Sequence, residues 1–98
     1  MKTREEYLDI LRNSKEYLMQ TYHITRLGIF GSVARNEQKE TSDVDVCFEG
    51  DSMGLFTMAR LKSELEKLLQ CSVDLLRMRK QLDGTYLQKS VMKDLIYV

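Results

Sequence analysis

The sequence has no net charge, few cysteines and no long apolar run. Its fifteen Lys and Arg residues balance fifteen Asp and Glu residues. Such a chain has no global field to attract nucleic acid or an anionic membrane, so we expect no direct binding to either. No segment is apolar for long enough to span a bilayer. The two cysteines, Cys47 and Cys71, follow no secretory segment at the amino terminus, which predicts reduced thiols and a cytoplasmic protein.

The length and the local distribution of charge narrow the expectations further. Ninety-eight residues without a repeat, linker or low-complexity tract predict one domain over 1–98, with a modest core. The charge is balanced overall but not locally. Between Glu37 and Asp51 six carboxylates stand against one cation, Lys39. This segment therefore favours a cation as its partner over a directly contacted polyanion.

The spacing of apolar residues predicts an alternation of helices and strands. Thr3 and Glu6 fit a capping box at the start of a helix that continues to about Tyr22. The pattern predicts an α/β (α+β) fold in which a small mixed sheet of three to four strands has helices on one face, in the order α-β-α-β-α-β-α. After the first helix we expect a strand at 24–30, a short helix at 33–38, a strand at 43–49, a helix capped by Asp51 or Ser52 with an apolar stripe from Leu55 to Leu69, a strand at 72–76, a helix marked by Leu87, Val91 and Leu95, and a short strand at 96–98.

Two aspartates open the second expected strand. Asp43 and Asp45 are two residues apart, so their side chains leave the same face of the strand, while Val44 and Val46 point to the core. Two adjacent carboxylates repel each other, and a divalent cation between them removes the conflict. Mg²⁺ suits a partial set of oxygen ligands that substrate phosphates complete. The plainer interpretation of this pair is a turn cap followed by an exposed residue on the sheet.

Two further features favour a metal and phosphate site over a turn cap and an exposed sheet residue. Gly31 and Ser32 follow a strand and open a helix, where backbone N–H groups can hold a phosphate, although a simple turn has the same pattern. Asp74 lies between Val73 and Leu75 in the third expected strand, so its side chain should face away from the core as those of the other two aspartates do. Three carboxylates on one open face beside a phosphate-binding turn are hard to explain as structure alone.

These motifs resemble a known family. Gly31-Ser32, ten residues, Asp43-Val44-Asp45 and a later Val73-Asp74-Leu75 are similar to the minimal nucleotidyltransferases of the DNA polymerase β-like superfamily, whose palm-like fold the resemblance implies. The segment from Phe30 to Arg35 is similar to the most characteristic stretch of that family. The resemblance implies that Gly31 and Ser32 contact nucleotide phosphates. It further implies that Asp43, Asp45 and Asp74 bind two Mg²⁺ ions and that Asp74 helps to activate the attacking hydroxyl. Asn36 departs from the family, which usually has glycine there.

The resemblance also implies an activity and a partner. We expect transfer of a nucleotidyl group, AMP from ATP, to a hydroxyl with loss of pyrophosphate. Family members of this size are commonly antitoxins that adenylylate a HEPN-type ribonuclease toxin, so a hetero-oligomer or a homodimer is expected. A rival hypothesis is a module without catalytic activity that neutralises such a toxin by occlusion. A glycosyltransferase with a DxD motif is disfavoured because the chain is too short for a sugar-nucleotide domain.

Other polar residues receive structural interpretations. We expect Arg35 to pair with Glu37 or to brace the aspartates, and His23 to end a helix. Cys47 is interpreted as a small buried thiol. Three cations follow the third expected strand: Arg77, Arg79 and Lys80. They could approach phosphates, but the favoured interpretation is a solvent-exposed connection.

Overall fold

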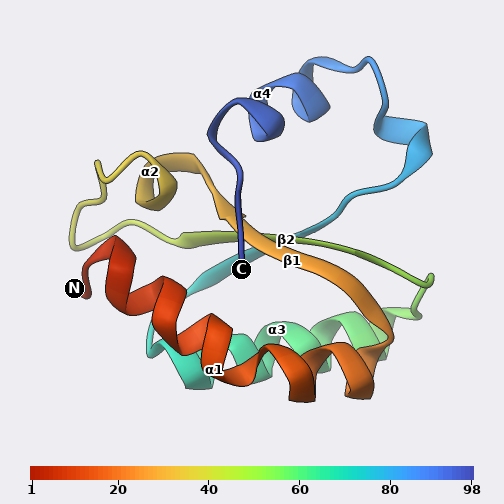
Figure 1. Ribbon diagram of the computed structural model, residues 1–98, viewed down its shortest axis with the longest axis horizontal. Coiled ribbons are helices and arrows are strands. Elements are labelled where there is room, and N and C mark those ends of the chain that lie inside the picture. The colour runs from red at the N-terminus through yellow and green to blue at the C-terminus, as the bar shows by residue number, and fades with distance from the viewer.

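The computed structural model describes all residues, 1–98, and contains a four-stranded sheet with helices on both sides (Figure 1). The strand order is β3-β2-β1-β4; β1 pairs with β2 and β4 in antiparallel fashion, and β2 pairs with β3 in parallel. The elements in chain order are α1 (Arg4–Tyr22), β1 (Ile24–Phe30), α2 (Gly31–Ala34), β2 (Val44–Gly50), α3 (Leu55–Leu69), β3 (Val73–Arg77), the 3₁₀ turn η1 (Lys80–Leu82), α4 (Tyr86–Asp94) and β4 (Ile96–Tyr97). The expected mixed sheet and element order are confirmed. The expectation of helices on one face alone was wrong, because α2 and α4 lie on the other face.

The two long helices cover one face of the sheet. The capping box of α1 is present: the Thr3 hydroxyl accepts from the Glu6 backbone N–H, and the Glu6 carboxylate accepts from the Thr3 N–H. Leu11 and Leu18 of α1 and Leu65 of α3 pack from this side and are fully buried. Figure 1 shows α1 and α3 on one side of the sheet, with α2 and α4 on the other. None of the helices has the length and apolar content needed to cross a membrane.

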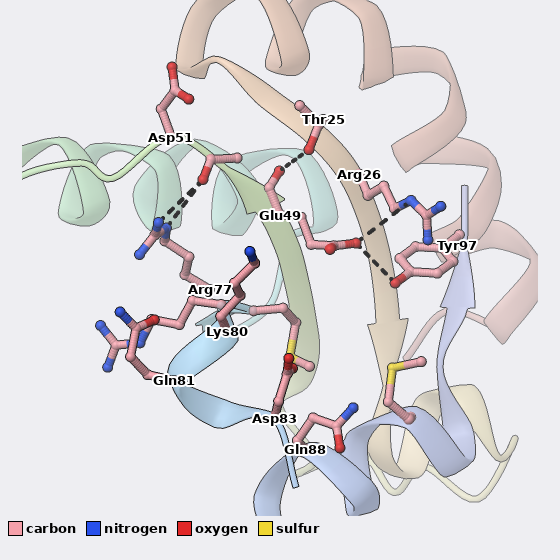
Figure 2. Close-up of a pocket in the computed structure, with 14 residues that line it drawn as sticks. Thr25, Arg26, Glu49, Asp51, Arg77, Lys80, Gln81, Asp83, Gln88 and Tyr97 are labelled. Carbon is pink, nitrogen blue, oxygen red and sulfur yellow. Dashed lines mark hydrogen bonds and ion pairs between the residues drawn. The ribbon is translucent and has the colours of Figure 1, made fainter. Parts of the chain in front are cut away.

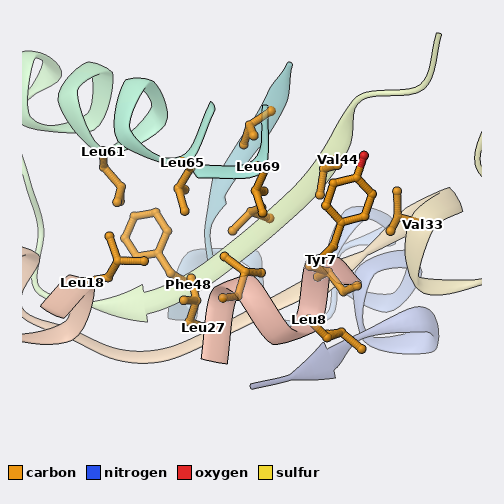
Figure 3. Close-up of a cluster of buried hydrophobic side chains, with 14 of the residues drawn as sticks. Tyr7, Leu8, Leu18, Leu27, Val33, Val44, Phe48, Leu61, Leu65 and Leu69 are labelled. Atoms are coloured by element: carbon orange, nitrogen blue, oxygen red, sulfur yellow. The ribbon is translucent and has the colours of Figure 1, made fainter. Parts of the chain in front are cut away.

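The side chains of strand β2 alternate between the two faces of the sheet, and three of them supply the middle of the core. Val44, Val46 and Phe48 are fully buried against α1 and α3, as Figure 3 shows for Phe48 between Leu18 and Leu61. The same alternation places Asp45, Cys47 and Glu49 on the opposite face, where only Cys47 is fully buried. We call this opposite side of the sheet the open face.

Several expectations about element ends were wrong, including that of the third strand, which is Val73–Arg77 and not 72–76. The strand begins at Val44, so Asp43 precedes it. The short helix expected at 33–38 is only Gly31–Ala34, because Asn36 takes the left-handed conformation, with φ 60°, and ends it. The cap of α3 is Gly54, which offers no side-chain hydrogen bond, instead of Asp51 or Ser52. Leu55 is 81% exposed, so the apolar stripe of α3 begins after it.

Candidate active site

The aspartates meet where β2 and β3 begin. Asp45 and Asp74 are partners in the parallel register of these strands, so their side chains stand next to each other on the open face. Asp45 is half-buried, whereas Asp43, just before β2, and Asp74 are exposed. The structure therefore brings together the three carboxylates that the sequence singled out, at one end of the sheet.

Electrostatics at this end are unfavourable for the carboxylates alone. Burial, together with the charges of Asp74 and Asp43, raises the pKa of Asp45 to about 6. The charge of Arg35 acts in the opposite direction but does not offset these effects. A cation is the missing partner that this arrangement favours.

The donor set fits a divalent cation that shares its ligands with a substrate. As the side chains are placed, no group of three or more His, Cys, Asp or Glu residues converges closely enough to hold a metal ion. Mg²⁺ commonly binds through one or two carboxylates, several waters and substrate phosphates, so a closed cage of side chains is not required. Asp45 and Asp74, with Asp43 beside them, provide such an incomplete set.

Gly31 lies directly against this cluster. Strand β1 ends at Phe30, whose register partner is Asp45, and the chain then turns into α2. Gly31 has φ of +71°, and a Cβ atom added to it would overlap the Oδ2 atom of Asp45. The positive φ therefore favours glycine, and a Cβ atom at this position would displace the Asp45 carboxylate. Ser32 follows in the first turn of α2 and is partly buried.

Arg35 fastens this turn to α4. Its Nη1 atom is 2.6 Å from Oδ2 of Asp94 and its Nε atom is 3.5 Å from Oε2 of Glu37. The expected pairing with Glu37 is confirmed. The closer partner, Asp94, was missed because it is 59 positions away in the chain and belongs to no local pattern. Arg35 thus connects the Gly31-Ser32 turn to the helix that crosses the open face.

Two structural interpretations from the sequence are confirmed. His23 is the left-handed C-cap of α1, with φ of 55°. Cys47 is fully buried, and burial raises the pKa of its thiol to about 12. Neither residue contributes to the cluster of aspartates.

A cavity of about 650 Å³ occupies the other end of the open face (Figure 2). We call it the basic pocket. Arg77, Arg79 and Lys80 line it, so the segment interpreted as a solvated connection forms a wall, although Arg79 and Lys80 are exposed. The remaining lining residues are Thr25, Arg26, Glu49, Gly50, Asp51, Met78, Gln81, Asp83, Gln88, Met92 and Tyr97. Sequence reasoning missed the residues from β1 and β4, because only the strand pairing brings them to this end.

Comparison with known proteins agrees with the fold and the site. The family model described as nucleotidyltransferase domain matches residues 11–98. A chain of Methanocaldococcus jannaschii named "Putative protein adenylyltransferase" is 39% identical over 99 residues and is aligned over the whole of both chains. A Thermococcus cleftensis chain named "Protein adenylyltransferase MntA" is 34% identical over 100% of this chain and 98% of its own length. The chain belongs to the nucleotidyltransferase domain family.

Solved structures share the architecture. One described as a "putative minimal nucleotidyltransferase" has a TM-score of 0.75 and 31% identity, over 97% of this chain and 95% of its own. Another is the complex of a tri-AMPylated Shewanella oneidensis HEPN toxin with an MNT antitoxin, with a TM-score of 0.60 over 96% of this chain and 66% of the other. At 19% identity the second likeness shows the fold alone.

Proposed function

We propose that residues 1–98 act as one nucleotidyltransferase domain that transfers AMP from ATP to a hydroxyl of a partner protein. The observation that carries the proposal is the half-buried Asp45, paired in register with Asp74, beside Asp43 and against Gly31. Relatives aligned over the whole chain and named protein adenylyltransferases support the choice of AMP and of a protein acceptor. ATP as donor and two cysteines without a disulfide support the cytoplasm as the place of action.

Each residue of the site has a defined task in this reaction. Gly31 leaves room for Asp45 and lets the backbone of the turn approach the triphosphate, and Ser32 adds a hydroxyl donor for a phosphate oxygen. Asp43, Asp45 and Asp74 would hold Mg²⁺, two ions by resemblance, which neutralises the triphosphate and the charge that develops on the phosphoryl oxygens. The exposed Asp74 carboxylate is available to accept the proton of the attacking hydroxyl.

The bond changes balance with ATP as the only co-substrate. The acceptor oxygen forms a bond to the α-phosphorus of ATP, and the bond from that phosphorus to the bridging oxygen of the β-phosphate breaks. Pyrophosphate leaves with the electron pair, and the acceptor proton passes through Asp74 to solvent. The product is a phosphodiester between the acceptor and adenosine.

The acceptor belongs to a partner of the HEPN toxin type, and its modification silences the toxin. The fold neighbour in complex with an AMPylated HEPN toxin supports this choice, as do relatives named for the same activity. The sheet leaves its open face beside Asp74 free for a docking segment. An added adenylate brings negative charge and bulk, which would repel and exclude RNA phosphates from a ribonuclease site.

Co-expression with the product of the adjacent gene tests the proposal. Intact-mass spectrometry of that product should show adenylate increments with the wild type and none with the Asp43→Asn plus Asp45→Asn variant, which should remain folded and unfold cooperatively. If the double variant protects cells fully and the wild type adds no mass, a module that acts by occlusion explains the data instead.

Calorimetry gives a second readout, because ATP binding should require Mg²⁺. Equal binding of ATP in EDTA and in Mg²⁺ would rule out the metal assignment.

Asp74 can be tested separately. Asp74→Asn should reduce turnover more than ATP binding, because its task follows the binding of ATP. If this variant keeps its fold but loses ATP binding, Asp74 belongs to the primary nucleotide site.

A further inference from the structure

We infer that the basic pocket binds an adenylate that has already been transferred to the acceptor and so supports successive additions of the kind that the tri-AMPylated toxin of the fold neighbour carries. The inference rests on the proposed function. It concerns a second part of the open face that holds none of the three aspartates.

The position of the pocket suits the product side of the reaction. Asp45 and Glu49 point to the same face of β2 and are four residues apart, which is about 13 Å along a strand. Glu49 lines the pocket, whereas Asp45 belongs to the candidate active site at the other end. An acceptor that carries an adenylate near the aspartates and extends over the open face would therefore bring that adenylate to the pocket.

The charge of the pocket suits a phosphodiester. Its lining carries four cations and three carboxylates, an excess of one positive charge, and a phosphodiester carries one negative charge. Arg77, Arg79 and Lys80 take part in none of the ion pairs of the structure. Arg77 is held in place because its Nε and Nη2 atoms each donate to the carbonyl oxygen of Gly50 at 3.4 Å. Its remaining N–H groups are available for phosphate oxygens.

A platform for a base lies on the other side of the pocket. The guanidinium of Arg26 lies 5.0 Å from the centre of the Tyr97 ring, and Glu49 fixes both groups, with Oε2 at 3.7 Å from Arg26 Nε and 3.2 Å from the Tyr97 hydroxyl. Figure 2 shows this group on one side and Arg77 and Lys80 on the other. The Arg26 side chain is 62% exposed, so its plane is open to stacking by a base.

The rest of the lining completes the chemistry of a nucleotide site. Met78 and Met92 supply apolar surface, and the amides of Gln81 and Gln88 supply both donors and acceptors for base edges. A volume of about 650 Å³ lies within the range of small-molecule sites. The acidic residues Asp51 and Asp83 disfavour a more highly charged ligand such as a free triphosphate.

The second transfer is chemically complete. A ribose hydroxyl of the bound adenylate attacks the α-phosphorus of another ATP, a new phosphodiester forms, pyrophosphate leaves, and the proton goes to solvent through Asp74. No oxidant or further co-reactant is needed.

A binding experiment in EDTA tests the pocket without the catalytic reaction. The probe is fluorescently labelled diadenylate. Arg79→Glu plus Lys80→Glu should weaken its binding at least tenfold, since both side chains are exposed and make no contact that the fold requires. The matched control, Arg60→Glu plus Lys62→Glu, makes the same charge change on exposed positions of α3 and should bind as the wild type does. The inference would be overturned if both variants bound diadenylate equally well or if the wild type did not bind it. It would also be overturned if the wild type bound ATP and AMP but not diadenylate.

Mass spectrometry of the modified partner provides the second readout. The wild type should give a series of adenylate increments, and the Arg79→Glu plus Lys80→Glu variant should lower the ratio of doubly to singly modified partner at least tenfold. A wild type that adds only one adenylate, or a variant with an unchanged series, contradicts the inference. If the wild type adds none, the proposed function fails, and the binding experiment alone decides whether the pocket is a nucleotide site.

Discussion

The two faces of strand β2 show how one short segment can serve two purposes. Val44, Val46 and Phe48 are fully buried by the helices on one side, while Asp45 and Glu49 belong to the candidate active site and the basic pocket on the other. The covered face gains its free energy from apolar burial and tolerates no cavity. The open face gathers like charges at one end, which lowers the stability of the protein when no cation is bound. Stability and activity should therefore respond separately to changes on the two faces.

The largest expected effect on stability is on the covered face. Phe48→Ala should lower the free energy of unfolding by about 3–5 kcal/mol, because it removes a fully buried ring and leaves a cavity. Phe56→Ala is the matched control, since Phe56 is 88% exposed, and it should change stability little. Urea unfolding measures both. A loss below about 1 kcal/mol for Phe48→Ala would mean that the core relaxes around the cavity.

The next largest expected effect is a loss of activity from a change on the open face. Gly31→Ala should reduce adenylyl transfer about 100-fold or more, because its Cβ would displace the Asp45 carboxylate. Gly84→Ala provides the control: Gly84 also has a left-handed backbone, with φ of +77°, but a Cβ there meets nothing within 4 Å. Both variants should lose about 1 kcal/mol of stability. Equal transfer by the two variants would show that the contact with Asp45 does not matter.

Sequence reasoning predicted the covered face better than the open one, for a physical reason. Burial by α1 and α3 follows periodicity, which a linear sequence displays directly, so the alternation of β2 and the leucines of α3 could be predicted. The aspartates were found because two of them are separated by a single residue and the third interrupts an apolar strand. The pair Arg35–Asp94 and the group Arg26–Glu49–Tyr97 depend on strand order and on where α4 crosses the sheet. No local pattern encodes either arrangement.

The pH dependence of stability should report the cost of the open face. The folded state raises the pKa of Asp45 from about 4, the usual value for aspartate, to about 6. Between these values the folded state binds more protons than the unfolded state, so the stability of the protein in EDTA should fall as pH rises through this window. Above pH 6 the ionised Asp45 carboxylate lowers the free energy of unfolding by its full amount, on the order of 1 kcal/mol after solvent screening.

Asp45→Asn should remove this penalty. In EDTA the variant should melt at a higher temperature than the wild type above pH 6, and the difference should shrink as pH approaches 4. Glu40→Gln, an exposed change outside the cluster, should run parallel to the wild type. A pH profile of Asp45→Asn that keeps the wild-type slope would show that another group titrates in this window.

The smallest expected effect compares one helix from each side of the sheet. Thr3 caps α1 and Thr85 caps α4, and each hydroxyl accepts from a backbone N–H three residues later, at 3.2 and 3.1 Å. Helix α1 buries five side chains, whereas α4 buries only Val91. Thr3→Ala should therefore lower global stability by about 1 kcal/mol, because α1 unfolds only with the core. Thr85→Ala should instead speed hydrogen exchange within α4 and change the melting temperature less, since α4 can open locally. If Thr85→Ala lowers global stability as much as Thr3→Ala does, α4 is part of the same cooperative unit as the core, and the open face is less independent of the covered face than its sparse packing indicates.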